Sequence, residues 1–140
     1  DKTNLSIICS DLSQVSEYAR YDNQSFRLLK DNTPGPFTFL LKSTSSLPKA
    51  FKGRKIVGVR IPDCSTIRAI VDLLGRPILT TTIEYTDDDY AINVDLIAEA
   101  YDNKVDFIID GGDGDTEPST VIDCTIDEPE IVRKGKGKLK

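Results

Sequence analysis

The sequence predicts an α/β (α+β) fold, in which one domain contains a twisted mixed sheet flanked by helices. Runs rich in β-forming residues alternate with amphipathic helical stretches, but no strict strand–helix–strand repeat is present. A chain of 140 residues, 39% hydrophobic and 29% charged, suits a globular domain with one core. No internal repeat or low-complexity linker divides it.

The first quarter of the chain predicts a strand followed by two capped helices. Residues 4–9, NLSIIC, are rich in β-forming side chains and predict a core strand. Asp11 is the expected N-cap of the first helix, and Asp22 stands where the second begins. Phe26 and Leu29 are expected to face inward from that second helix.

Two strands and the clearest helix of the chain follow. The near-continuous apolar run 37–42, FTFLLK, predicts a strand buried on both faces, and 55–60, KIVGVR, predicts another. We expect Asp63 to cap the next helix and Gly75 to end it. The apolar face of this helix has the spacing i, i+3, i+4 and i+7 and consists of Ile67, Ile70, Val71 and Leu74.

The second half of the chain predicts shorter elements. Residues 78–82 form an expected buried strand, 85–91 an acidic loop, and Asn93 the start of a further helix. Three more strands are expected, separated by turns that contain glycine or proline: 105–109, 120–124 and 130–132.

Composition excludes several classes of function. The chain has no histidine, which removes Ser-His-Asp and His-Glu-x-x-His chemistry. The cysteines Cys9, Cys64 and Cys124 lack the spacing of a zinc site, so buried reduced thiols are the simpler interpretation. A net charge of −5 disfavours an unselective nucleic-acid coat protein, which would be basic.

The charge is uneven along the chain. Residues 133–140, RKGKGKLK, carry five cations and no anion, and form either a solvated, mobile terminus or an RNA contact. The longest apolar runs are too short to span a bilayer, and no leader sequence opens the chain. We therefore expect a cytoplasmic protein with no membrane partner.

Two motifs that look like ligand sites fail on spacing. The run 110–117, DGGDGDTE, lacks the glycine and glutamate positions of a calcium loop, so a solvated turn is expected and no metal site is predicted. The run 135–138, GKGK, lacks the spacing and the Ser/Thr of a phosphate-binding loop. Any phosphate binding must then come from side chains gathered from several loops.

Two arginines and a set of hydroxyls are the better candidates. Arg60 and Arg133 each end a β-rich run, where a planar guanidinium can meet a carboxylate or phosphate. Taken singly, each arginine could form a surface salt bridge, and each nearby threonine or serine could be a simple strand or turn residue. Their joint order favours a site for an anionic ligand that carries hydroxyls.

That order resembles the YrdC/YciO family, in which corresponding segments line one large cavity. Residues 3–36 look most like the YciO branch, and the resemblance implies a YrdC-like domain over 1–133 with a basic tail at 134–140. The matching segments are PGPFT at 34–38, GVRIP at 58–62, PILTTT at 77–82, PSTV at 118–121 and IVR at 131–133.

The resemblance implies an L-threonylcarbamoyladenylate synthase, a nucleotidyltransferase that joins ATP, L-threonine and bicarbonate for threonylcarbamoyladenosine modification of tRNA. It implies ATP as a substrate and Mg²⁺ on the leaving phosphates. Carried over by position, the L-threonine site is formed by Arg60, Thr80 and Ser119. The nucleotide site is formed by Thr82, Arg133 and, as a neighbour of the cavity, Thr38.

The resemblance also has departures. Glu84 stands where the family's synthases have asparagine, and an acid there would repel a triphosphate. The family's Lys-x-Arg phosphate clamp falls upstream of residue 1, with Lys2 beside it as a phosphate or RNA contact, so this chain is expected to be inactive by itself. The alternatives are a double-stranded RNA or tRNA-binding module without catalysis, and a degenerate paralogue.

Overall fold

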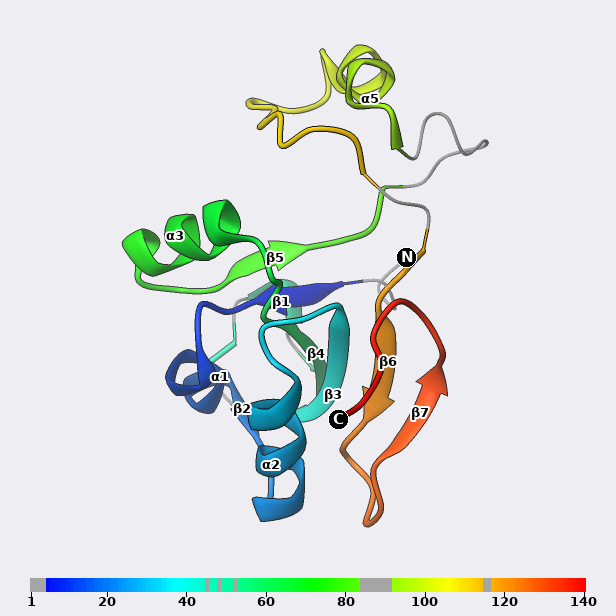
Figure 1. Ribbon diagram of the computed structural model, residues 1–140. Helices are drawn as coiled ribbons and strands as arrows, with labels where there is room; N and C mark the ends of the chain where they lie inside the picture. Colours follow the sequence, from blue (N-terminus) through cyan, green and yellow to red (C-terminus); the bar gives the residue numbers. More distant parts are fainter. Residues whose placement is uncertain (1–4, 45, 48, 52, 84–91, 115–116) are drawn as a thin grey trace. The chain divides into compact units, whose positions relative to one another are not determined.

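The computed structural model describes residues 5–44, 46–47, 49–51, 53–83, 92–114 and 117–140 (Figure 1). Contacts divide the chain into two compact units. Unit 1 comprises Asp1–Thr81 and Ser119–Lys140, and unit 2 comprises Thr82–Pro118. The predicted α/β class is confirmed, because unit 1 is built on a mixed sheet with helices beside it.

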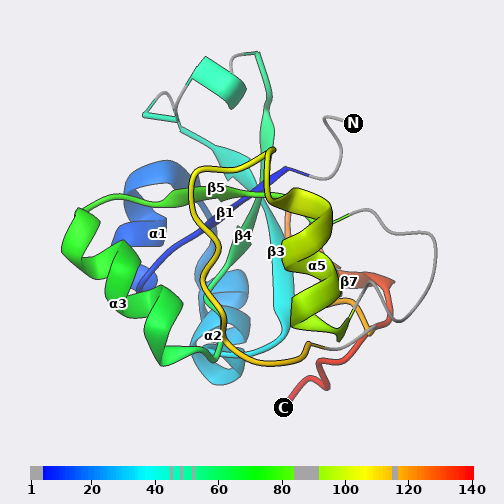
Figure 2. The same ribbon diagram turned by 90° about the horizontal axis from the view of Figure 1, so that it is seen from above.

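The sheet of unit 1 has the strand order β5-β1-β4-β3-β6-β7, with β2 pairing with β3. Figure 2 shows β5, β1, β4 and β3 of this sheet from above. The pairs β1–β4 and β3–β6 are parallel, and the other pairs are antiparallel. This mixture agrees with the predicted absence of a strict βαβ repeat. The strands are β1 (Ser6–Ile8), β2 (Ala19–Arg20), β3 (Phe37–Ser43), β4 (Ile56–Arg60), β5 (Ile78–Thr80), β6 (Thr120–Asp123) and β7 (Glu130–Arg133).

The helices begin largely where the capping residues predict. Asp11 and Asp22 each accept a hydrogen bond from a backbone N–H in the first turn, at 2.9 and 2.8 Å, and Asn93 caps the helix of unit 2. Gly75 ends a helix with a φ of 74°, which glycine adopts without steric penalty. The helices are α1 (Leu12–Tyr18), α2 (Asn23–Asn32), α3 (Ser65–Leu74) and α5 (Val94–Tyr101), with a 3₁₀ turn at Lys49–Phe51.

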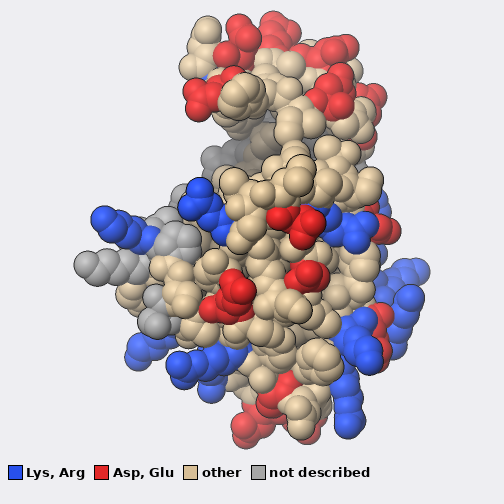
Figure 3. All heavy atoms as spheres, turned by 90° about the vertical axis from the view of Figure 1, so that its left-hand side faces the viewer, with Lys and Arg blue, Asp and Glu red and all other residues tan. Residues whose placement is uncertain are grey.

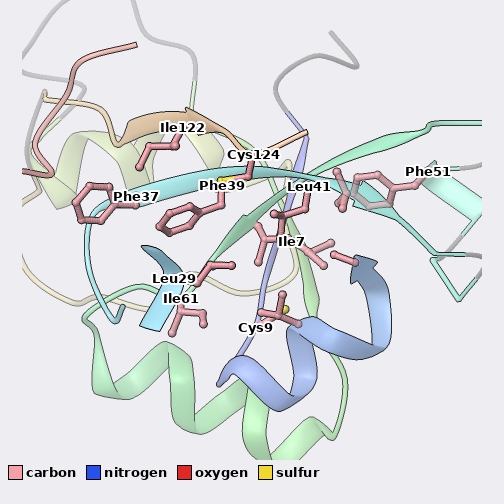
Figure 4. Close-up of a cluster of buried hydrophobic side chains, with 14 residues drawn as sticks. Ile7, Cys9, Leu29, Phe37, Phe39, Leu41, Phe51, Ile61, Ile122 and Cys124 are labelled. Carbon is pink, nitrogen blue, oxygen red and sulfur yellow. The ribbon is translucent and has the colours of Figure 1, made fainter. Parts of the chain in front are cut away.

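One face of the sheet forms the hydrophobic core (Figure 4). In β3 the buried residues are Phe37, Phe39 and Leu41, which alternate with half-buried or exposed ones. Val15 of α1 and Leu29 of α2 are fully buried in the same cluster. The prediction that β3 is buried on both faces is therefore wrong, since its alternation leaves the second face available for other roles.

Other sequence expectations need correction. Residues 105–109 are not a strand, and Phe107 is 88% exposed. The N-cap of α3 is Cys64, which makes no capping bond, while Asp63 lies 3.9 Å from Arg68 in an ion pair. Phe26, which was expected to face inward, is 37% exposed, and its ring stacks on that of Tyr21.

The C-terminal tail is fixed to unit 1 by its backbone. The Gly135 N–H donates to Thr120 Oγ1 at 3.0 Å, and that hydroxyl donates to the Gly137 carbonyl at 2.7 Å. The Lys140 N–H donates to Asn32 Oδ1 at 2.8 Å. A Cβ at Gly137 would come within 2.6 Å of the Phe37 ring, so only glycine lets the tail approach this closely. The tail thus lies against unit 1 along its backbone, while its lysine side chains are exposed, as expected for a solvated terminus.

The described part of unit 2 is formed mainly by α5 and the loop that follows it. The Val94 N–H donates to Asp113 Oδ1 at 3.1 Å, and the Gly114 N–H donates to the Ile92 carbonyl at 2.7 Å, which ties the loop back to the start of the helix. Acidic side chains dominate its described surface (Figure 3). The expected acidic loop at 85–91 lies outside the described residues. None of the helices described in either unit is long and apolar enough to cross a membrane.

Candidate functional site

The second face of the sheet carries the residues that the sequence singled out. Thr38 alternates with Phe37 and Phe39 along β3, and Arg60 alternates with the buried Val59 along β4. Neighbouring strands place their paired residues on the same face, so the registers put Thr38 and Arg60 on one side of the sheet. This face, which we call the hydroxyl–arginine face, lies opposite the core.

Ser119 connects two strands of this face. Its Oγ lies 2.7 Å from Thr38 Oγ1, a hydrogen bond in which either hydroxyl can donate. Arg133 donates from Nε and Nη2 to the Ser119 carbonyl, at 3.2 and 2.9 Å, and from Nη2 to Ser119 Oγ at 3.2 Å. The sheet explains this meeting, because Val121 of β6 pairs with Thr38 on one side and Arg133 on the other.

Arg60 completes the cluster with a second positive charge. Its Nε atom is buried and has no hydrogen-bond partner among the described residues. Burial lowers the pKa of Arg60 below its usual value, and the charge of Arg133 lowers it further. Because a guanidinium stays protonated in proteins, the buried charge persists and needs an anion. The ion pair between Asp63 and Arg68 involves neither arginine of the cluster.

Gly58 keeps the space beside these side chains open. A Cβ built on it would lie 3.1 Å from Ser6 Cβ and 3.2 Å from Thr38 Cγ2, closer than most real contacts. Gly58 was not among the residues predicted to be functional. A glycine inside a strand is nevertheless a signal for close approach of another group, and it could have been read that way.

The remaining predicted site residues are placed less directly. Thr80 of β5 pairs with Ser6, which pairs with Gly58, so Thr80 shares the face but lies two strands, roughly 10 Å, from β4. Thr82 belongs to unit 2, and the cluster of Thr38, Arg60, Ser119 and Arg133 belongs to unit 1. Lys2 and Glu84 lie outside the described residues.

The cluster does not fit a metal ion held by protein ligands. Its polar groups are two guanidinium groups and two hydroxyls, whereas Mg²⁺ takes oxygen ligands, above all carboxylates. The described residues contain no group of three or more Asp, Glu, Cys or His that could hold a metal ion. What this arrangement can do is bind and orient an anion.

An α/β domain with a cationic, hydroxyl-lined sheet face is the class of protein that fold and site define. The model of the Sua5/YciO/YrdC family, described as telomere recombination, matches residues 1–135. The chain belongs to this family.

Individual relatives agree with the family and with the fold. The uncharacterized protein YciO of Escherichia coli K12 is 40% identical over 147 residues, an alignment that covers 100% of this chain and 69% of the relative. The crystal structure of E. coli YciO matches with a TM-score of 0.85 and 39% identity, over 96% of this chain and 67% of that one.

More distant relatives carry names that indicate an activity. A Methanocaldococcus jannaschii protein, provisionally named threonylcarbamoyl-AMP synthase, is 30% identical over 132 residues, covering 94% of this chain and 62% of the relative. The crystal structure of P. abyssi Sua5 complexed with L-threonine matches with a TM-score of 0.82 and 28% identity, over 94% of this chain and 40% of that one.

Proposed function

We propose that the protein is a threonylcarbamoyl-adenylate synthase, which uses ATP, L-threonine and bicarbonate. The observation that carries the proposal is the Arg60 guanidinium, which is partly buried beside Arg133 and leaves a buried N–H donor without a partner among the described residues. A folded protein tolerates such a group mainly where a ligand satisfies it, because an unsatisfied buried donor costs about 1–3 kcal/mol. The likeness to Sua5 with bound L-threonine supports an amino-acid carboxylate as the partner.

The proposed roles follow the position of each group. Arg60 offers a planar fork to the threonine carboxylate, while Ser119 and Thr80 offer hydroxyls to its polar groups. Arg133 and Thr38 contact the nucleotide phosphates. Ser119 touches both Arg133 and Thr38, so it joins the amino-acid and nucleotide parts of the proposed site.

The chemistry needs positioning and charge neutralisation more than proton transfer. The uncharged amine of threonine adds to bicarbonate with loss of water and forms a carbamate. A carbamate oxygen then bonds to the α-phosphorus of ATP as the bond to pyrophosphate breaks. Fixed guanidinium groups stabilise the negative charge of this step, and holding both reactants in place lowers its barrier. This reaction is compatible with a chain that lacks histidine. The product would then serve the modification of tRNA.

Calorimetric titration of this chain with L-threonine tests the proposal at its first step. We expect Arg60→Gln to weaken threonine binding at least tenfold, because the neutral amide loses the charged, bidentate contact. Arg60→Lys keeps the charge but loses the planar fork, and should recover only part of the affinity.

Arg76→Gln is the matched control, since it removes an exposed arginine just beyond the end of α3. It should leave threonine binding unchanged. A folded Arg60→Gln protein that binds threonine as tightly as the parent chain would contradict the proposed role of Arg60.

A further inference from the structure

A second group of cations lies at the other end of the hydroxyl–arginine face. A groove of about 590 Å³ is formed where β2, the end of β3 and the start of β4 meet. We call it the basic groove. Its lining residues are Arg20, Lys42, Ser43, Thr44, Arg54, Lys55, Ile56 and Thr125. None of them is acidic.

The strand registers place the cations of this groove. Arg20 pairs with Lys42 across β2 and β3, and Lys42 pairs with Ile56 across β3 and β4. Lys42 lies four residues beyond Thr38 on the same face of β3, a separation of about 13 Å. The basic groove therefore shares a sheet face with the cluster around Arg60, but it shares no residue with it.

Three cations of the basic groove are not neutralised by an ion pair within the described part of the chain. The side chains of Arg20, Lys42 and Lys55 are exposed and make no ion pair with a described residue. The nearby carboxylate of Asp123 accepts hydrogen bonds from the Thr125 N–H and Oγ1, at 2.9 and 2.6 Å. Arg20 and Lys42 are neighbours on paired strands, and two positive charges side by side attract an anion from solution.

The hydroxyl groups of the basic groove are already engaged. Ser43 Oγ donates to the Arg54 carbonyl at 2.7 Å, and Thr44 Oγ1 donates to the Glu17 carbonyl at 3.0 Å. The donors left for a ligand are therefore the cations. No aromatic ring is among the described residues that line the groove, so it offers a nucleobase no aromatic platform on which to stack. These features select phosphate oxygens rather than a base or a sugar.

We infer that the basic groove is a second anion site, which binds phosphate groups through Arg20 and Lys42. The phosphate could belong to the backbone of a single-stranded RNA or to a free polyphosphate, because both present the same oxygens. The inference does not depend on the proposed synthase activity, since none of the groove residues belongs to the cluster around Arg60.

A pair of double variants tests the inference at equal net charge. Arg20→Gln/Lys42→Gln removes two cations of the groove, and Arg27→Gln/Lys30→Gln removes two exposed cations of α2 outside it. Fluorescence anisotropy measures binding of a labelled single-stranded RNA of mixed sequence over a series of salt concentrations. Calorimetry measures binding of inorganic tripolyphosphate.

For an RNA ligand, the groove variant should bind about fivefold to tenfold more weakly than the α2 variant. The slope of log K against log salt concentration should also be smaller in magnitude by about 1.4, because two phosphate contacts are lost. Oligo(A) and oligo(U) should bind alike. For a free phosphate ligand, only tripolyphosphate binding should weaken in the groove variant. If the groove variant and the α2 variant bound RNA equally and also bound tripolyphosphate equally, the inference would be overturned. As a control, threonine binding should be the same in the two variants.

Discussion

The two faces of β3, a strand of seven residues, serve opposite purposes. Phe37, Phe39 and Leu41 are at most 4% exposed and pack into the core, whereas Thr38 and Lys42 face the other way among hydroxyls and cations. On the core face, apolar side chains pack against one another. On the other face, the buried Nε–H of Arg60 has no hydrogen-bond partner among the described residues, and the charge of Lys42 is exposed. The comparison teaches that in this sheet stability and ligand binding are separated by the alternation of side chains along one strand.

The largest expected effect comes from the core face. Phe39 is fully buried and stacks on Phe37 with ring centroids 5.8 Å apart. Phe39→Ala should lower the free energy of unfolding by about 3–5 kcal/mol, through lost transfer energy and a cavity. A urea titration followed by circular dichroism measures this. A loss below about 1 kcal/mol would mean that the core does not depend on this face of β3.

The second prediction closes the space on the other face. In Gly58→Val, the new side chain would press on Ser6 and Thr38, whose nearest atoms lie 3.1 and 3.2 Å from the position that a Cβ would take. We expect a loss of about 1–3 kcal/mol in stability from overpacking, together with loss of threonine binding. A folded variant with unchanged threonine affinity, measured by calorimetry, would show that the proposed site does not use this space.

The third prediction reverses the usual sign of a mutation. Arg60→Met replaces a partly buried cation with an apolar side chain of similar length, which removes both the unpaired donor and the repulsion from Arg133. We expect a gain of about 1 kcal/mol in stability, with threonine binding abolished. Differential scanning calorimetry and titration test the two parts. A destabilised variant would mean that Arg60 has a structural partner.

The smallest effect is a pH dependence of the core. Burial, then the charges of Asp11 and Glu17, raise the pKa of Cys9 from 9.0 to about 12. The folded state thus keeps a proton that the unfolded chain loses above pH 9. This contribution to stability is complete below pH 9 and falls as the pH rises toward 12.

Urea midpoints at pH 8 and pH 10 measure this change. The midpoint should drop between the two, and the drop should be smaller in Cys9→Ala, which lacks the thiol but keeps every other group that titrates there. Equal drops in the two proteins would count against the buried thiol.

The sequence predicted the fold class and the helix starts better than it predicted which distant residues lie close together. Asp11, Asp22 and Asn93 were recognisable as N-caps because their short side chains accept hydrogen bonds that a helix start leaves unsatisfied. Residues 105–109 were mistaken for a strand because local β-propensity cannot tell whether a partner strand is present. Phe26 was expected to face inward, but helical periodicity predicts which face of the helix a residue lies on and not how deeply it is buried.

The sequence suggested which residues belong to the candidate site, but it did not predict how they are arranged in space. Arg60 and Arg133 stood out because each ends a β-rich run, but their proximity follows from a strand order that joins β4, β3, β6 and β7. No spacing in the sequence specifies that order. The basic groove was missed for the same reason, since Arg20 and Lys42 become neighbours only through the pairing of β2 with β3.

The hydrogen bond between Thr38 and Ser119 has a consequence for the variety of ligands that this face can meet. Two hydroxyls hold two protons, and their mutual bond uses one of them, whichever oxygen donates. The other proton is always left over, on Ser119 in one arrangement and on Thr38 in the other. Rotation of each hydroxyl about its own C–O bond exchanges the two arrangements. The pair therefore acts as a movable single donor, able to follow an acceptor that shifts during a reaction without any change in the backbone.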